Sequence, residues 1–532
     1  MQNDYLQLVE QFKATKEVLM NPQPYYMDLA LPQDDFYNSV CIVGGGLAGY
    51  LSAIAFRKFF NIPVTVIEPS HIPPIGVGEA TTPLMADYLF GVLELDKQEF
   101  FRMVEPTWKL GIKFFWGKPG DYYFNYPFDT KDILSAYLHS GDVNECSLNS
   151  LLMRQDASFI ARYEEDGTEK YHSLSKNLKY AYHLDNRKFI DYLKFAAARA
   201  GVIFLDEEIK DAVLNEEGEV AALINVNGDK FVYDLYVDCS GFKSMLLEKK
   251  MNVPYVSFQD SLFNDRAVTG ILPNNGHIKC YTTAETMDNG WCWNIPLRHE
   301  DHRGYVYSSA HCTEEQAIEE MLRKNPGMSA SSIKHVRFRS GRHERFVEGN
   351  VVAIGNAYSF VEPLESTGVH MIIDQIILLM NHFVLLKKNP ALRNLLNDTM
   401  KEHWEYIRWF LSIHFKYNKK FDTPYWKDCR ANGNTSGFEK FLSLYKEIGL
   451  LSRQDTTTRN MIQPWLKDTI FDVYGIDHIL FCQGVLPGNI QQLSPENKAD
   501  WNAMLHVWKN IAAKTIPLRE DLDIMLKHPQ LL

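Results

Sequence analysis

The sequence predicts an α/β protein with a Rossmann-like nucleotide-binding unit, a second sheet layer and a mostly helical C-terminal region. Three observations predict this fold. A glycine-rich turn at residues 44–49 follows a short apolar run and opens a longer apolar stretch. Apolar runs at 235–238 and 351–354 each lead into a turn of small residues. Beyond about residue 385, the hydrophobic patterns are mostly helical.

The first unit of the fold has the order strand, glycine turn, helix, strand. Val40-Cys41-Ile42-Val43 is apolar throughout, as expected of a strand buried on both faces. A helix is expected from about Leu47 to Phe59, and the strand Val64-Thr65-Val66-Ile67-Glu68 follows. Glu68 comes roughly 20 residues after the glycines, where a Rossmann unit keeps the carboxylate that binds a ribose.

Later segments complete the predicted fold. A helix is expected from about Asp185 to Ala200, because Phe189, Leu193 and Ala196 form one apolar stripe, and Gly201 ends it. The runs at 235–238 and 351–354 read as buried strands of the same sheet, which makes the nucleotide-binding domain discontinuous. The intervening residues, about 250–345, should form the second sheet layer.

The glycine turn has a defined physical task. Gly44 permits the tight turn, Gly46 lets the backbone approach a pyrophosphate, and Gly49 lets the helix pack on the strand. The unpaired N–H groups at the helix start then favour a phosphate. The motif alone does not separate FAD from NAD, and no second motif of this kind offers a site for NADPH.

Composition and charge narrow the function. The chain of 532 residues has a net charge of −12 and no block of basic residues, which argues against nucleic-acid binding. The eight cysteines include no CxxC pair, so no metal site is expected. No signal peptide is visible, and the apolar stretch 371–386 is too short and too polar for a bilayer. We therefore expect a cytoplasmic protein without a membrane segment; a homo-oligomer is compatible with the sequence.

Several motifs resemble flavin-dependent halogenases of the tryptophan-halogenase type. Trp291-Cys292-Trp293-Asn294-Ile295-Pro296 resembles their WxWxIP signature. Further similar segments are Gly76-Val77-Gly78-Glu79-Ala80-Thr81-Thr82-Pro83, Trp108-Lys109-Leu110-Gly111-Ile112-Lys113-Phe114, Glu362-Pro363-Leu364-Glu365-Ser366-Thr367-Gly368 and Asp422-Thr423-Pro424-Tyr425-Trp426. The resemblance spans about residues 39–430. It implies the FAD-binding fold of GR2-type flavoprotein monooxygenases.

The resemblance also implies domains and roles. An N-terminal extension (1–38) would precede a FAD-binding and halogenation core (39–400) and a helical substrate-side region (401–532). A separate flavin reductase would supply FAD as FADH2, and chloride, bromide or iodide would be the halide. Lys109 and Glu365 would be catalytic. The remaining assignments are the cofactor contacts Gly44, Gly46, Leu47, Ala48, Gly49, Glu68, Ala80, Arg187, Gly355 and Gly368; the halide contacts Thr367 and Gly368; and a partition between flavin and substrate made by Trp291, Trp293, Ile295 and Pro296.

The residue types suit this chemistry. Hypohalous acid is a small, diffusible oxidant, and a lysine amine can hold it by a hydrogen bond or capture it as a haloamine. The amine must be neutral for this, so we expect burial to lower the pKa of Lys109, whose apolar neighbours indicate a buried segment. Lys113 is its nearest rival. Glu365 would stabilise positive charge on an aromatic ring and accept the ring proton, although a carboxylate at a helix start is also common.

The expected substrate site departs from the family. A histidine and a phenylalanine sandwich the indole in tryptophan halogenases, and these positions fall on Tyr126 and Phe128; Pro363 is also assigned to the substrate site. The missing histidine predicts an aromatic pocket not shaped for free tryptophan. Electron-rich rings such as indoles, phenols or other heteroaromatics are the expected substrates. Bromide or iodide, which are oxidised more easily, should outperform chloride.

Two alternatives stay open from the sequence. An aromatic flavoprotein monooxygenase would need its substrate against the flavin, which the pair Trp291 and Trp293 opposes. A non-catalytic flavin-binding protein would have no use for Lys109, Glu365 and Thr367 together.

Overall fold

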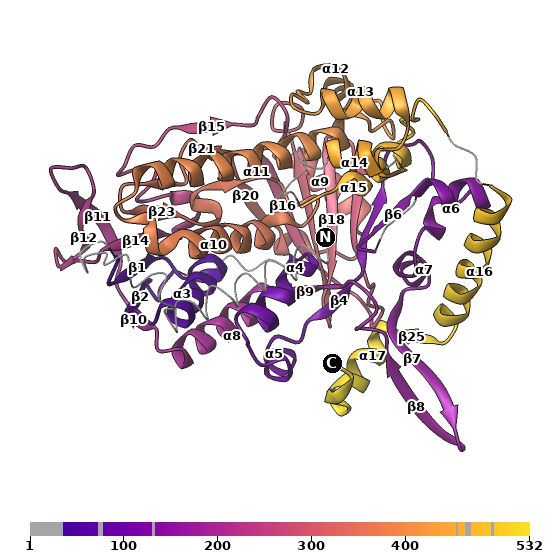
Figure 1. Cartoon of the computed structure of the whole chain (residues 1–532), viewed down its shortest axis with the longest axis horizontal. Helices are drawn as coiled ribbons and strands as arrows, with labels where there is room; N and C mark the ends of the chain where they lie inside the picture. The colour runs from indigo at the N-terminus through magenta and orange to yellow at the C-terminus, as the bar shows by residue number, and fades with distance from the viewer. Residues whose placement is uncertain (1–35, 73–77, 130–132, 454–455, 463–469, 491–493) are drawn as a thin grey trace.

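The computed structural model describes residues 36–72, 78–129, 133–453, 456–462, 470–490 and 494–532. Most of the expected N-terminal extension, and Gly76 and Val77 of the loop motif, lie outside these residues. Figure 1 shows the glycine-turn unit at one end of the molecule and the C-terminal helices at the other, with long helices running between them.

The nucleotide-binding sheet forms as predicted. Its strand order is β10-β2-β1-β14-β23-β22, and all neighbours are parallel except β22 and β23. Every residue of the strands β1, β2, β14 and β23 is buried, which explains their continuous apolar sequences. The sheet consists of β10 (Ile203–Leu205), β2 (Val64–Ile67), β1 (Val40–Val43), β14 (Leu235–Asp238), β23 (Val351–Ala353) and β22 (Val347–Glu348). The predicted discontinuous origin of its strands is confirmed.

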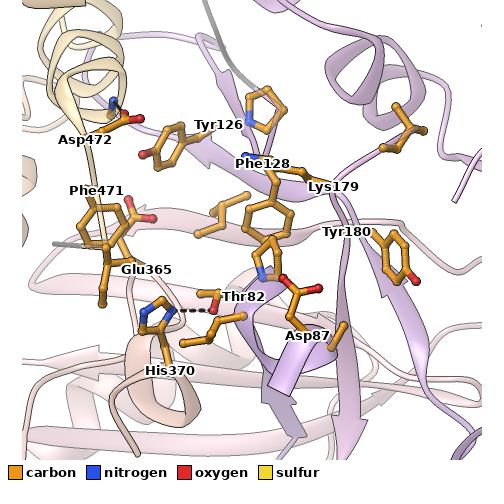
Figure 2. Close-up of a pocket in the computed structure, with 18 of the residues that line it drawn as sticks. Thr82, Asp87, Tyr126, Phe128, Lys179, Tyr180, Glu365, His370, Phe471 and Asp472 are labelled. Atoms are coloured by element: carbon orange, nitrogen blue, oxygen red, sulfur yellow. Dashed lines mark hydrogen bonds between the residues drawn. The ribbon is translucent and has the colours of Figure 1, made fainter. Parts of the chain in front are cut away.

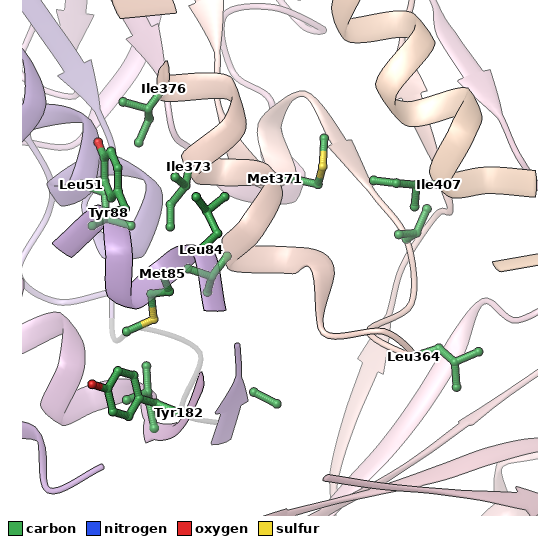
Figure 3. Packing of buried hydrophobic residues seen from close by; sticks show 14 of the residues in the cluster. Leu51, Leu84, Met85, Tyr88, Tyr182, Leu364, Met371, Ile373, Ile376 and Ile407 are labelled. Atoms are coloured by element: carbon green, nitrogen blue, oxygen red, sulfur yellow. The ribbon is translucent and has the colours of Figure 1, made fainter. Parts of the chain in front are cut away.

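Helices cover this sheet. The helix α3 (Gly46–Phe60) leaves the glycine turn, and α8 (Asn186–Arg199) packs beside it. The side chain of Asp185 accepts hydrogen bonds from the first N–H groups of α8, which fixes its start where the sequence predicted it. The helix α10 (Thr367–Leu386) packs on α3, and Figure 3 shows their contact through Leu51, Ile373 and Ile376.

The helix α10 is long and apolar enough to span a membrane by length and composition alone. In its most apolar window, however, 61% of the residues are buried inside the protein. It lies between α3 and α11 (Pro390–Lys416). Its hydrophobicity therefore serves the core, as the sequence predicted.

The second sheet carries the Trp291–Pro296 segment, again as predicted. Its order is β20-β16-β19-β18-β17-β5-β6. Its last two strands come from well before the predicted range of 250–345, because β5 pairs in parallel with β17. The strands are β20 (Lys334–Arg337), β16 (Arg266–Pro273), β19 (Glu300–Tyr307), β18 (Gly290–Pro296), β17 (Thr282–Met287), β5 (Gly111–Phe115) and β6 (Phe124–Pro127).

Smaller sheets connect segments that lie outside the two main sheets. The sheet β3-β9-β4 joins the loop after β2 to the strand that carries Lys109, because both pair with β9. Its strands are β3 (Gly78–Ala80), β9 (Ala181–Asp185) and β4 (Thr107–Lys109). The other small sheets contain β11 (Ile209–Leu214), β12 (Val220–Asn225) and β13 (Lys230–Phe231); β15 (Tyr255–Ser257), β21 (Gly341–His343) and β24 (Ser359–Phe360); and β25 (Thr515–Pro517), β7 (Ala157–Glu165) and β8 (Thr168–Ser173).

The C-terminal part is mostly helical, as predicted. The helix α11 runs without interruption across residue 400, where the sequence suggested a domain boundary; the division into domains stays a prediction. The later helices are α12 (Pro424–Asn432), α13 (Glu439–Ile448), α14 (Thr456–Ile462), α15 (Val473–Cys482), α16 (Pro495–Ala512) and α17 (Leu518–Lys527). Short helices elsewhere are α4 (Pro83–Ala86), the π-helix η2 (Asp87–Val92), α5 (Lys97–Val104), α6 (Ile133–Ser140), α7 (Leu148–Arg154) and α9 (Glu314–Lys324).

Candidate active site

A cavity of about 850 Å³ lies at the carboxyl ends of β1 and β2, where a Rossmann fold binds its ligand. The glycine turn, β3, the start of α10 and part of β18 line it. Its walls include Gly44, Gly46, Leu47, Ala48, Glu68, Ala80, Trp293, Ile295, Pro363, Ser366 and Gly368. Most of the cofactor contacts expected from the sequence therefore border one cavity.

The glycine turn forms a cradle that larger residues would fill. A Cβ atom at Gly44 would lie 2.6 Å from the carbonyl oxygen of Cys239, and one at Gly49 would lie 2.2 Å from the Gly44 oxygen. At Gly46, with φ of +80°, nothing lies within 4 Å of the Cβ position. The backbone there faces open space at a helix N-terminus, which fits a dinucleotide pyrophosphate.

Glu68 follows β2 directly and lines the same cavity. Its carboxylate accepts hydrogen bonds from the Tyr50 hydroxyl and from the Lys194 ammonium, the latter at 2.6 Å. These contacts hold the carboxylate at the strand end, where it could bind a ribose hydroxyl. The residues present thus fit FAD.

Some assigned residues lie elsewhere. Within the described residues, Gly355 and Arg187 line neither this cavity nor the one described next; Arg187 is exposed, and its neighbour Asn186 borders the large cavity instead. Pro363, assigned to the substrate, borders the large cavity. Arg187 is exposed in the first turn of α8, and Pro363 lies in the segment before α10; sequence spacing alone does not determine which cavity such residues face.

A further cavity, of about 550 Å³, has an aromatic inner wall. Tyr126, Phe128, Glu365 and Phe471 line it, as Figure 2 shows. The Tyr126 ring packs against His478 of α15, with the two ring centroids 5.0 Å apart. Both aromatic residues aligned with the family's sandwich therefore border one cavity together with Glu365.

The outer part of this aromatic cavity is polar. Asp87 and Lys176 are exposed, Lys179 is half-buried, and all three line the cavity. None of these residues, nor Phe471, belongs to a motif that the sequence reveals. They come from η2, from the segment after β8 and from the segment before α15, so no local motif marks them.

Lys109 ends β4 and is fully buried. Its Nζ donates hydrogen bonds to the Thr81 carbonyl oxygen at 2.9 Å and to the Ser366 hydroxyl at 2.7 Å. Burial lowers the pKa of Lys109 to about 7, against the opposing attraction of Glu365 and Glu79. The amine is therefore close to half neutral near neutral pH, as expected for a nucleophile.

The two carboxyl groups acting on Lys109 belong to different cavities. Glu365 lines the aromatic cavity, and Glu79 of β3 lines the large one. Burial raises the pKa of Glu79 to about 7, while the charge of Lys109 opposes the shift. Ser366, which also lines the large cavity, accepts a hydrogen bond from Lys109. Lys109 lines neither cavity itself, but its Nζ also lies 5.3 Å from the centroid of the Phe128 ring in the aromatic cavity, so its contacts reach both cavities.

Lys113 has a different setting. Its Nζ donates hydrogen bonds to the Tyr281 hydroxyl at 2.9 Å and to the Met153 carbonyl oxygen at 3.3 Å. Within the described residues, Lys113 lines neither of these cavities, as is also true of Lys109, but the hydrogen-bond partners of Lys113 line neither of them either. This rival therefore lacks the contacts of Lys109.

Thr367 and Gly368 open the helix α10. Among the described residues, no side chain caps this N-terminus, and the preceding Ser366 is left-handed, with φ of 58°. Thr367 is buried, and Gly368 lines the large cavity. Free N–H groups and a hydroxyl at a helix start suit a small anion.

Trp291 and Trp293 lie on the same face of β18, with ring centroids 5.9 Å apart. Trp293 borders the large cavity, and the Trp291 Nε1 donates a hydrogen bond to Glu362 at 2.5 Å. Burial raises the pKa of Glu362 to about 7. The carbonyl oxygen of Pro296 accepts a hydrogen bond from the Thr107 hydroxyl at 2.6 Å, which ties the end of β18 to the strand of Lys109.

Among the described residues, no group of three or more His, Cys, Asp or Glu side chains could hold a metal ion. The cysteines Cys41, Cys146, Cys239, Cys280, Cys292, Cys312, Cys429 and Cys482 are buried and free.

A dinucleotide-binding cavity, a buried lysine of lowered pKa and an aromatic cavity fit an oxidoreductase that acts on aromatic compounds. The family model described as tryptophan halogenase matches residues 39–498. The chain belongs to this family and is a flavin-dependent halogenase.

Relatives with known activities agree. The chain is 33% identical to tryptophan 6-halogenase SttH of Streptomyces toxytricini over 74% of this chain and 81% of that protein. It is 30% identical to tryptophan 7-halogenase RebH of Lentzea aerocolonigenes over 77% of this chain and 82% of that protein. Among solved structures, it resembles MibH, a lanthipeptide tryptophan 5-halogenase, with 38% identity and a TM-score of 0.86 over 94% of this chain and 96% of that one.

Proposed function

We propose that this chain is the halogenating half of a two-component system, in which a separate flavin reductase supplies FADH2. When bound, FADH2 reacts with O2, a halide ion and a proton to give FAD, hypohalous acid and water. The glycine turn and Glu68 would hold the dinucleotide, with Gly46 against its pyrophosphate. The start of α10 at Thr367 and Gly368 would hold the halide.

Lys109 would direct the oxidant to the substrate. Its neutral amine either holds hypohalous acid by a hydrogen bond or reacts with it: an N–halogen bond forms, the halogen–oxygen bond breaks, and water leaves with the amine proton. The observation that carries the proposal is the buried Lys109 amine, with a pKa of about 7, which donates a hydrogen bond to Ser366 of the large cavity and lies 5.3 Å from the centroid of the Phe128 ring of the aromatic cavity. Trp291 and Trp293 would keep the organic substrate from the flavin, which disfavours direct hydroxylation.

Glu365 would complete the substitution. The halogen adds to a ring carbon as its bond to the Lys109 nitrogen, or to the oxygen of hypohalous acid, breaks; that atom keeps the electron pair and takes up a proton. Glu365 stabilises the cationic ring and then accepts the ring proton while the C–H electrons restore aromaticity. Bromide or iodide would be used in preference to chloride, since both are oxidised more easily.

The proposed substrate is an indole carried by a peptide. MibH, named for a lanthipeptide, shares 38% identity with this chain, and the family's histidine is replaced by Tyr126. The aromatic cavity leads from buried Glu365 to exposed Lys176, so a ring could enter while the chain that carries it stays outside. Lys176 and Lys179 at the opening would favour an acidic peptide segment.

The deciding experiment combines purified protein, a flavin reductase, NADH, FAD and bromide with tryptophan-containing peptides and small aromatics. Bromination of an indole, detected by mass spectrometry and lost on omission of the reductase, supports the proposal. A hydroxylated, unhalogenated product would support the monooxygenase alternative instead. A cytoplasmic location and a homo-oligomeric state also stay predictions.

A further inference from the structure

A buried histidine lies against the proposed base. His414 belongs to α11, and both its side chain and that of Glu365 are almost fully buried. The His414 Nε2 and the Glu365 Oε1 are 2.7 Å apart and hydrogen bonded. The two residues are 49 positions apart in the sequence, and no motif joins them.

The other ring nitrogen determines where the protons are. The His414 Nδ1 lies 2.9 Å from the carbonyl oxygen of Phe410, one turn earlier in α11. A carbonyl oxygen only accepts hydrogen bonds, so Nδ1 must carry a hydrogen. A hydrogen bond between Nε2 and a carboxylate oxygen then needs one more proton between them. His414 and Glu365 therefore share a proton.

The ring has little freedom to turn away. Its centroid lies 5.2 Å from that of Phe410 and 5.6 Å from that of Phe114. The His414 carbonyl oxygen accepts a hydrogen bond from the Trp116 Nε1 at 2.9 Å, which fixes this turn of α11. The other titratable groups interacting with Glu365 are Lys109 on β4 and Tyr126 on β6.

We propose that His414 is a positioning residue that presents one oxygen of Glu365 to the substrate. The inference rests on the proposed function of Glu365 as the base. By binding Oε1, His414 leaves Oε2 for the aromatic cavity that Glu365 lines. When the ring C–H bond breaks, its electrons stay in the ring and the proton joins Oε2, while the shared proton stays between Oε1 and Nε2. Rotation of the carboxylate is thereby prevented during the step.

A matched pair of variants separates this role from packing. In His414→Gln, the amide nitrogen reaches the position of Nε2 and can still donate to Glu365. In His414→Asn, it reaches only the position of Nδ1 and can still donate to the Phe410 oxygen. Both replace the ring by an amide and so remove the same aromatic contacts; turnover of a matched phenol reports any further effect of the shorter Asn side chain on packing.

We expect kcat for an indole substrate to fall about 10-fold or less in His414→Gln and about 100-fold in His414→Asn, with KM unchanged in both. The rate of phenol turnover should change by the same factor in the two variants, and so should the rate at which hypohalous acid is released. Equal losses of indole turnover in the two variants would overturn the inference. Glu365→Gln is measured beside them: if that variant brominates the indole normally, the proposed base itself is wrong.

A spectroscopic measurement on the wild type tests the shared proton without turnover. ¹⁵N NMR of histidine-labelled protein, assigned by loss of one signal pair in His414→Gln, should show a protonated Nδ1 and a Nε2 shift that changes strongly in Glu365→Gln. An unprotonated Nδ1, or a Nε2 signal that ignores Glu365, contradicts the shared proton. This readout does not depend on flavin or turnover.

Discussion

At the scale of residues, the burial of Lys109 leads to a test of the relay. Lys109→Ala should lower bromination of an indole by about 100-fold or more, since the group that holds the oxidant is lost. Oxidation of FADH2 and release of hypohalous acid, trapped by a chlorination-sensitive dye, should stay near normal. Lys113→Ala is the matched control, because Lys113 is also a buried lysine on a neighbouring strand. Halogenation that survives in Lys109→Ala but fails in Lys113→Ala would reverse the assignment.

The charge of Lys109 also sets a pH dependence. Below its pKa of about 7 the amine is protonated and cannot capture the oxidant, so kcat should rise as the pH rises through about 7. The charged groups that act on Lys109 are Glu79 and Glu365. His183 also interacts with Lys109, but burial, with a smaller contribution from the Lys109 charge, holds the pKa of His183 well below its usual range.

Glu79→Gln provides the check. Removing this carboxylate takes away an attraction that stabilises the ammonium, so the pKa of Lys109 falls and the rising limb moves to lower pH. The pH profile of kcat in wild type and variant measures the shift, with exposed Glu315→Gln as the control. If kcat of Glu79→Gln rises at the same pH as in the wild type, or at a higher pH, the proposed effect of Glu79 on Lys109 is wrong.

At the scale of elements, the turn between β1 and α3 can be tested by matched glycines. Gly46 and Gly120 have φ of +80° and +76°, and neither has an atom within 4 Å of its Cβ position. Gly46→Val and Gly120→Val should therefore strain the backbone alike. Only Gly46→Val should abolish FAD binding, because its side chain enters the cavity at the pyrophosphate position. The affinity for FAD is measured by titration of flavin fluorescence. Equal affinities in the two variants would show that FAD does not bind at this turn.

The strand β18 offers a test of the tryptophan partition. Gly304 of β19 leaves room for Trp293: a Cβ there would lie 1.9 Å from its ring. Gly304→Ala should displace the ring and uncouple FADH2 oxidation from halogenation. Gly270→Ala on β16 is the control, since it crowds only the flexible Met328, at 2.7 Å. Both should cost about 1–3 kcal/mol of stability. Coupling, measured as product formed per FADH2 oxidised, should fall only in Gly304→Ala.

The same elements show what a sequence can predict. The strands β1, β2, β14 and β23, the glycine turn and the Trp291–Pro296 strand were predictable, because their patterns follow from local burial and backbone geometry. His414 and Phe471 were not, because they reach the site through helix packing across the fold. Arg187 was expected at the cofactor but is exposed on α8, and Pro363 was expected at the substrate but lines the large cavity. Sequence spacing indicates which residues are near a site, and tertiary packing decides which of them face it.

At the scale of the whole molecule, the distribution of charge bears on the substrate. The protein carries a net charge of −12, yet the partly exposed charges that line the aromatic cavity are Lys97, Lys176 and Lys179 against Asp87 and Asp472. This region is therefore less acidic than the protein as a whole, and an acidic peptide would be repelled less there than elsewhere on the surface. A free tryptophan zwitterion gains much less from this field.

We therefore predict that kcat/KM for a tryptophan within an acidic peptide exceeds that for free tryptophan by about 10-fold or more at low salt. The preference should shrink as salt screens the charges. The double variant Lys176→Gln/Lys179→Gln should raise KM for the acidic peptide and leave KM for a neutral peptide of the same length unchanged. Lys324→Gln/Lys334→Gln is the control pair, because Lys324 at the end of α9 and Lys334 on β20 do not line the aromatic cavity. The measurement is competitive bromination of peptide and free amino acid by mass spectrometry. Strong, regioselective turnover of free tryptophan, with no advantage for either peptide, would contradict both the pocket interpretation and the role of the two lysines.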